Sequence, residues 1–356
     1  MPSRRHNGTA IATAFQVCNP RVLSSCCLPV SGTHARTQGL VKGKLIVEHD
    51  LPKHLKQSLF ADGGEYPVFC RYSSEPGDPG LDVILPELLL PPPHETDTQQ
   101  DRIPQPRGFA MKVFNVKGEM FDAGKDVPTH DIEFNSTPAL DLADAKTTRE
   151  IIDLRIKFGN NQPELYKHLE ARKDTDLQKF RDTVRNTHLE STRQYSQTAY
   201  RFGDYVCKYC LVPSSETQKK LYDDTVKPDK HDSDILSNWL KNFHGAHDAE
   251  YLLQFQLCEN LEDQPVEYAG KVWDPEKYPW QTVARLVIPK QDSFNYELKA
   301  FWEDRLRVDP WLGLKSMQPL GSPNRLRRTV YPASSALRRK MNGTSEIHVK
   351  SMDEIP

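Results

Sequence analysis

The sequence has no long apolar run and almost no net charge. No window approaches the roughly 18 consecutive apolar residues that a membrane-spanning helix needs, and the mean hydropathy is −0.66. The 47 Lys and Arg residues nearly balance the 49 Asp and Glu residues, which leaves a formal charge of −2 at pH 7. Such a chain supplies no overall field for holding a polyanion. We therefore expect no transmembrane segment and no nucleic-acid partner.

Cysteines are few and scattered. Seven Cys residues, an odd number in a chain of 356, do not form the pattern of a disulfide framework. Cys207 and Cys210 form a C-x-x-C pair within the apolar run 205–212, which is typical of a strand. Residues three apart on a strand point to opposite faces, which argues against a shared redox or metal site. A c-type haem needs His directly after the second Cys, where Leu211 stands.

The length and the hydrophobic share of 37% allow one large domain or two. Residues 1–47 contain six Lys and Arg residues and no acid. Because they show neither an amphipathic stripe nor an apolar signal region, we interpret 1–30 as a basic, poorly ordered tail rather than as a targeting segment. We expect one domain over 31–345 and a C-terminal tail over 346–356. The end of the chain carries no peroxisomal or lipidation signal, so the expected location is cytoplasmic.

Two sets of four strands are predicted, with helices between them and at the end. Short β-rich runs bounded by Gly, Pro and Asp cover 40–49, 66–72, 108–116, 129–134, 200–212, 251–258, 282–289 and 296–302. Helical spacing of apolar residues covers 140–158, 162–172, 177–187, 232–243 and 324–341. The Pro-rich stretch 74–105 is predicted to be a surface insertion. These elements favour an α+β fold, an antiparallel eight-stranded β-barrel with flanking helices.

Three clusters far apart in the sequence hold residues suited to chemistry. The first is 33–36, the second joins 106–112 to 131–138, and the third covers 322–338. In the first, His34 is a candidate general base. In the third, Arg327 lies one helical turn from Tyr331, where a guanidinium favours the phenolate. Free Tyr titrates at about 10, so it needs such a cation, or the metal itself, to become a metal ligand. A proximal Tyr on ferric haem fits this pattern, and so does a basic helix with a buried Tyr and no cofactor.

Taken in this order, the clusters resemble the haem catalase family over roughly residues 34–341. The family's motifs and their counterparts are the distal-His setting at 33–36, R-F-S-T at 71–74, D-P-R-G-F-A-V-K at 105–112, D-L-V-G-N-N-T-P at 131–138, K-V-W at 271–273 and R-L-F-x-Y-P-D at 327–333. Within the family, the chain looks most similar to small, divergent catalase-like haem proteins. The resemblance implies a catalase-type barrel whose C-terminal helix lies on the proximal side of the haem.

The resemblance also implies a role for each matching residue. His34 and Asn135 would be the catalytic groups on the distal side of haem b, and Tyr331 would be the axial ligand of its ferric iron. The other implied cofactor-binding residues are Arg327 beside the phenolate, Arg71 and Arg338 on the propionates, and Ser73.

Two positions depart from the family pattern. Ser31 stands where the family has a propionate-binding Arg, and Thr33 stands where typical catalases have Val before the distal His. A Thr there is similar to the catalase-related allene oxide synthases, whose Thr hydroxyl hydrogen-bonds the His and is linked to suppressed peroxide dismutation. Thr33 therefore joins the implied catalytic residues.

The expected function is that of a haem enzyme acting on hydrogen peroxide or an organic peroxide, of catalase or peroxidase type. Its partners would be the peroxide and a small organic reductant, and the chain could form a homodimer. Two alternatives remain open. Thr33 suggests the rearrangement of a fatty-acid or other organic hydroperoxide, and Ser31 suggests a haem-binding protein without catalytic activity.

Overall fold

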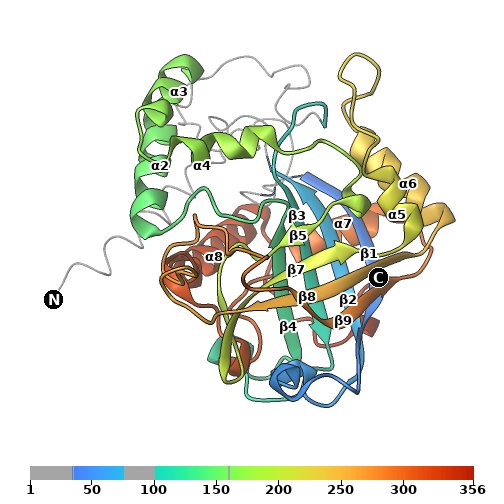
Figure 1. The fold of residues 1–356 in the computed structure, drawn as a ribbon. Coiled ribbons are helices and arrows are strands. Elements are labelled where there is room, and N and C mark those ends of the chain that lie inside the picture. The colour runs from blue at the N-terminus through green and yellow to red at the C-terminus, as the bar shows by residue number, and fades with distance from the viewer. Residues whose placement is uncertain (1–33, 35, 76–100, 159–160) are drawn as a thin grey trace.

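A closed antiparallel β-barrel forms the centre of the protein (Figure 1). The computed structural model describes residues 34, 36–75, 101–158 and 161–356. Eight strands form the ring in the order β1-β2-β3-β4-β5-β7-β8-β9, and β9 pairs with β1 to close it. The strands are β1 (Arg36–Val47), β2 (Gly64–Ser74), β3 (Arg107–Phe114), β4 (Thr129–Asn135), β5 (Gln194–Tyr195), β7 (Tyr205–Pro213), β8 (Ala249–Leu257) and β9 (Gln281–Ile288). The predicted antiparallel eight-stranded barrel is confirmed.

Helices surround the barrel. In Figure 1, α2, α3 and α4 lie together on one side of it, and α5 and α6 lie on another. The helices are α2 (Ala145–Phe158), α3 (Gln162–Glu170), α4 (Thr175–Phe180), α5 (Glu216–Leu221), α6 (Ile235–Ala246), α7 (Tyr296–Asp304) and α8 (Gly321–Asn342). Among the described residues, none of these helices has the length and apolar character needed to span a membrane.

The period-two pattern of β2, β3 and β4 separates a core face from an outer face. The residues that point into the barrel belong to its main hydrophobic cluster, namely Val68, Cys70, Tyr72, Phe109, Met111, Val113, Ile132 and Phe134. Their neighbours along each strand therefore point outward. Most of the outward residues on these strands are polar or small, and the candidate site is built from them.

One predicted strand is a helix. The run 296–302 was expected to be the eighth strand, but it forms α7. Asn295 caps this helix, because its side chain accepts hydrogen bonds from the backbone amides of Glu297 and Leu298. Leu298 and Trp302, four residues apart, are buried on one face. The segment is short and apolar, so its helical period is hard to distinguish from the pattern of a buried strand.

The eighth strand of the barrel lies in a segment where the sequence shows no strand pattern. It is the two-residue β5, which bridges β4 and β7. The predicted strand 200–212 is a hairpin of β6 (Tyr200–Phe202) and β7, turning at Gly203 with φ of 59°. β6 lies outside the ring, so the predicted number of barrel strands was right while one of the members was wrong.

The remaining boundaries differ less. The predicted helix 177–187 is shorter and earlier, as α4 followed by one 3₁₀ turn at Arg181–Thr183. The last eleven residues lie against the outer wall of the barrel, since Val349 and Ile355 pack with Leu40 and Phe69. The predicted N-terminal tail, 1–30, and residues 76–100 of the predicted insertion lie outside the described residues.

The two cysteines of the C-x-x-C pair lie on β7 and have different surroundings. Cys207 belongs to the core of the barrel, whereas the thiol of Cys210 contacts Arg193. Burial raises the pKa of both thiols, which disfavours the reactive thiolate. Within the described part of the chain, no three His, Cys, Asp or Glu side chains are grouped so that they could hold a metal ion.

Candidate functional site

The outward residues of β2, β3 and β4 form two neighbouring rows across the wall of the barrel. The first, here called the Gly108 row, is Ser73, Gly108 and Asn135, and the second, the Ala110 row, is Arg71, Ala110 and Glu133. The rows are two residues apart along each strand, which corresponds to about 6.5 Å. The middle residue of each row is small. The outer surface of the barrel is therefore lower at β3 than at the larger side chains of β2 and β4 on either side of it.

His34 lies on the Gly108 row. Its Nδ1 is 3.2 Å from the hydroxyl of Ser73, and its backbone carbonyl accepts a 2.7 Å hydrogen bond from Arg71. A Cβ atom on Gly108 would come within 2.5 Å of His34 Cε1. Only glycine therefore allows the imidazole to lie this close to the wall.

The environment of His34 keeps its ring neutral. Burial disfavours the charged imidazolium, and the positive charges of Arg71, Arg327 and Arg107 disfavour it further. Together they lower the pKa of His34 to about 3. A neutral ring at pH 7 carries one N–H donor and one bare acceptor nitrogen, the form that acid–base chemistry needs.

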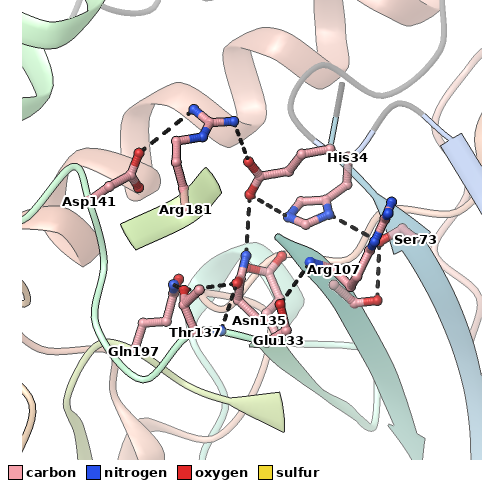
Figure 2. A network of polar contacts seen from close by, with 12 residues as sticks. His34, Ser73, Arg107, Glu133, Asn135, Thr137, Asp141, Arg181 and Gln197 are labelled. Carbon is pink, nitrogen blue, oxygen red and sulfur yellow. Dashed lines mark hydrogen bonds and ion pairs between the residues drawn. The ribbon is translucent and has the colours of Figure 1, made fainter. Parts of the chain in front are cut away.

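Asn135 lies at the other end of the Gly108 row (Figure 2). Its side-chain oxygen is occupied, because it accepts hydrogen bonds from the amide and the hydroxyl of Thr137. Its Nδ2 donates to Glu75 Oε1 at 3.2 Å. The amide is thereby fixed with its donor group directed to the same side as His34.

Glu75 joins the two predicted catalytic residues. Its Oε1 lies 3.5 Å from His34 Nε2 as well as 3.2 Å from Asn135 Nδ2. Its other oxygen, Oε2, accepts a 3.3 Å hydrogen bond from the largely buried Arg181. Figure 2 shows His34, Asn135 and Arg181 arranged around this point.

Tyr331 lies over the Ala110 row. It projects from α8, and its hydroxyl donates a 3.1 Å hydrogen bond to Glu133 Oε2. Burial and the negative charge of Glu133 raise the pKa of Tyr331 well above its usual value, against the opposing effect of Arg327. The expected effect of Arg327 on the phenol is therefore present, but in this structure Glu133 and burial outweigh it.

Two arginines lie beside the site, the buried Arg71 and the half-buried Arg338. Arg338 is seven residues after Tyr331, on the same face of α8. Within the described part of the chain, its buried Nε has no hydrogen-bond partner. Burial and the positive charge of Arg338 lower the pKa of Arg71 to about 10, although Glu303 opposes this. A buried and a half-buried guanidinium group that repel each other favour the binding of an anion between them.

The structure brings most of the predicted site residues to one region of the barrel wall. His34, Ser73 and Asn135 surround the Gly108 row, while Arg71, Arg327 and Tyr331 surround the Ala110 row. Ser31 and Thr33 lie outside the described residues.

Three charged residues of this region were not predicted: Glu75, Glu133 and Arg181. Two of them had a signal in the sequence. Glu75 directly follows the R-F-S-T-like stretch 71–74, and Glu133 stands where the D-L-V-G-N-N-T-P motif has Val. An acidic residue at a motif position that is normally apolar can be noticed from the sequence alone. Arg181 had none, because it is remote in the sequence from every motif.

Comparison with known proteins relates the chain to two groups. No family model matches the sequence. A curated relative, the linolenate 9R-lipoxygenase of Nostoc sp. strain PCC 7120, is 24% identical over 298 residues, which cover 77% of this chain and 34% of that protein. The chain therefore spans about a third of this relative's length.

Solved catalase structures share the fold at low sequence identity. A fungal catalase matches with a TM-score of 0.61 and 16% identity, covering 89% of this chain and 60% of that one. Catalase A from Saccharomyces cerevisiae matches with a TM-score of 0.56 and 15% identity over 89% and 62%. A bacterial catalase matches with a TM-score of 0.58 and 14% identity over 95% and 61%. The similarity extends over nearly all of this chain and about three fifths of each catalase.

Proposed function

From the catalase fold of this chain, we propose that the protein is a haem-dependent oxidoreductase that acts on hydrogen peroxide or organic hydroperoxides. In this proposal His34 is the distal acid–base residue, and Tyr331 is the axial ligand of ferric haem b.

The observation that carries the proposal is the relation between the two rows. His34 lies on the Gly108 row and Tyr331 contacts the Ala110 row, one step of about 6.5 Å further along the strands. A flat ring with its edge at the small residues Gly108 and Ala110 would have the imidazole on one face and the phenol on the other. This is the order that a distal base and an axial ligand require.

The arginine pair fits the acidic groups of haem b. The buried Nε of Arg338, which has no partner among the described residues, and the guanidinium of Arg71 would bind the propionates. Guanidinium groups suit carboxylates because they form charge-assisted, paired hydrogen bonds. The phenol of Tyr331 also has an acceptor for its proton in Glu133, 3.1 Å away. The donor set of this site therefore matches the cofactor.

A bound ferric haem would supply a Lewis-acidic iron and the electrons for breaking the O–O bond of a peroxide. The chain's own residues would handle the protons. His34 would exchange a proton with the peroxide through Nε2, while Ser73 holds the ring by Nδ1. Asn135 would donate a hydrogen bond to a peroxide oxygen, since its amide oxygen is already held by Thr137. Arg327 would stabilise the phenolate of Tyr331.

The Nostoc relative favours a second candidate, the rearrangement of a fatty-acid hydroperoxide. That protein is named for the oxygenation of linolenate, and Thr33 independently points to the allene oxide synthases. Under this second proposal, the same haem site would convert a lipid hydroperoxide without releasing oxygen.

The test is to add haemin to the purified protein and then offer hydrogen peroxide and a linolenate hydroperoxide in separate assays. Oxygen release from hydrogen peroxide, or oxidation of an added phenol, supports the first proposal. Loss of the lipid hydroperoxide without oxygen release or consumption of a reductant supports the second. A protein that takes up no haem contradicts both.

A further inference from the structure

A carboxylate occupies the point between the two distal groups. The Glu75 Oε1 atom lies 3.5 Å from His34 Nε2 and 3.2 Å from Asn135 Nδ2. These are the two atoms that would face a peroxide under the proposed function. Glu75 Oε1 therefore lies where a peroxide oxygen would be held, and Arg181 fixes the other carboxylate oxygen.

The contacts of the His34 ring determine which nitrogen carries the proton. Nδ1 faces the hydroxyl of Ser73 at 3.2 Å, and Nε2 faces the carboxylate of Glu75 at 3.5 Å. A carboxylate can only accept a hydrogen bond, whereas a hydroxyl can donate or accept. With the proton on Nε2, the Ser73 hydroxyl donates to Nδ1 at 3.2 Å in place of its longer, 3.4 Å hydrogen bond to the carbonyl of Gly108, and both ring nitrogens have suitable partners. With the proton on Nδ1, the lone pair of Nε2 faces a negative oxygen.

We propose that Glu75 is a further catalytic residue: it holds His34 in the form protonated at Nε2, and it accepts the proton of the hydroperoxide. This inference rests on the proposed function. For the first proton transfer His34 is then a hydrogen-bond donor, and the base is the carboxylate of Glu75. The proton exchange of His34 at Nε2 in the proposed function belongs to the later steps. Asn135 is the second donor, so two N–H groups and one carboxylate surround the peroxide oxygens.

The proton balance of the first step is simple. The O–H bond of the hydroperoxide breaks, its proton bonds to a carboxylate oxygen of Glu75, and the electron pair stays on the peroxide oxygen. The 3.2 Å hydrogen bond that Asn135 Nδ2 donates to Glu75 Oε1 passes to the substrate, and the N–H of His34 Nε2, which lies 3.5 Å from the same oxygen, turns to the substrate as well. Arg181 keeps the protonated side chain next to the site through Oε2.

Nitrogen NMR on histidine-labelled protein without added haem tests the positioning role, because ¹⁵N shifts distinguish a protonated ring nitrogen from a bare one. The signal of His34 is the one that is absent in H34Q. We expect a neutral ring protonated at Nε2 in the wild type and in E75Q, since the Gln carbonyl can still accept the hydrogen bond. In E75L, which has no acceptor, we expect the proton to move to Nδ1. A wild-type ring protonated at Nδ1 or at both nitrogens, or an unchanged ring in E75L, overturns this role.

Hydroperoxide turnover by the haem-loaded protein tests the base role. E75Q keeps the shape and the acceptor but cannot take a proton, so we expect turnover to fall by about 100-fold or more. E65Q is the matched control, because Glu65 is an exposed carboxylate paired with Lys44 on the barrel wall, and we expect no change. Unchanged turnover in E75Q overturns the base role. A wild-type protein that binds no haem removes the proposed function and the base role together, whereas the NMR result decides the positioning role separately.

Discussion

The phenol of Tyr331 on α8 donates a partly buried hydrogen bond of 3.1 Å to the carboxyl group of Glu133 on β4. Burial raises the pKa of Glu133 to about 7, although Arg327 opposes this. The proximal side of the proposed haem site therefore has both a cation and an acid beside the phenol. Since the family motif has Val where Glu133 stands, the surroundings of the proposed axial ligand, Tyr331, differ from those the resemblance implied.

His34→Gln should leave haem binding intact and reduce hydroperoxide turnover by about 100-fold or more. The variant keeps a side chain of similar size but cannot exchange a proton. Haem content from the visible spectrum and turnover of hydrogen peroxide and a lipid hydroperoxide are the measurements. Turnover at the wild-type rate in a haem-loaded variant would remove His34 from the mechanism.

Arg338→Met should weaken haem binding by roughly 10- to 100-fold, since one charge-assisted hydrogen bond to a propionate is lost. The free energy of unfolding without haem should not fall by more than about 0.5 kcal/mol, because the Arg338 Nε has no partner among the described residues and the group repels Arg71. Haemin titration and urea denaturation give the two values.

Arg325→Met is the matched control for this substitution. Arg325 lies on the same helix but forms an exposed ion pair with Glu267, so its loss should leave haem affinity unchanged. Equal haem affinities of the Arg338→Met variant and the wild type would show that Arg338 does not bind the cofactor.

Thr33→Val should increase oxygen release from hydrogen peroxide. The prediction follows from the family resemblance, in which a hydroxyl before the distal His goes with suppressed dismutation. An oxygen electrode measures the initial rate for both proteins at equal haem content. An unchanged rate would mean that the Thr33 hydroxyl does not affect the reaction.

His244→Leu should make the protein less sensitive to acid. The imidazole is fully buried, and neither ring nitrogen has a hydrogen-bond partner in the described structure. Burial lowers the pKa of His244 to about 4, below the value of about 6.5 in the unfolded chain. The unfolded state therefore takes up a proton first, and stability is lost as the pH falls from 6.5 to 4.

This single group contributes up to about 3 kcal/mol over that pH range, at about 1.4 kcal/mol per pH unit. Urea denaturation of the wild type and the variant at pH 7, 6 and 5 measures how steeply the free energy of unfolding of each protein changes with pH. His247→Gln, at an exposed position near the end of α6, is the control and should behave as the wild type. If the free energy of unfolding of the Leu variant changed with pH as steeply as that of the wild type, the lowered pKa of His244 would be contradicted.

The barrel could be predicted because the sequences of its longer strands show the period-two pattern of a half-buried strand. The runs that became β2, β3 and β4 alternate between core and outer residues, so their faces are visible in the sequence. β5 could not be found, because two residues contain no period. α7 was misread, since a short apolar segment fits both periods until the cap at Asn295 is recognised.

The site was predictable only as far as its residues could be matched to a family pattern. His34, Asn135 and Tyr331 come from distant parts of the chain, and their common location depends on strand register, which is a tertiary property. Glu75 and Glu133 stand next to matched residues but have no equivalent in the pattern, so the resemblance gave them no role.

The central claim is that Tyr331 holds an iron porphyrin, and its most direct test is the visible spectrum of the protein titrated with haemin. We predict saturable binding with the spectrum of a Tyr-ligated, high-spin ferric haem. Tyr331→Phe should abolish that spectrum, while the control Tyr296→Phe, at a 78% exposed position, should keep it. An identical spectrum in Tyr331→Phe and the wild type would contradict the account.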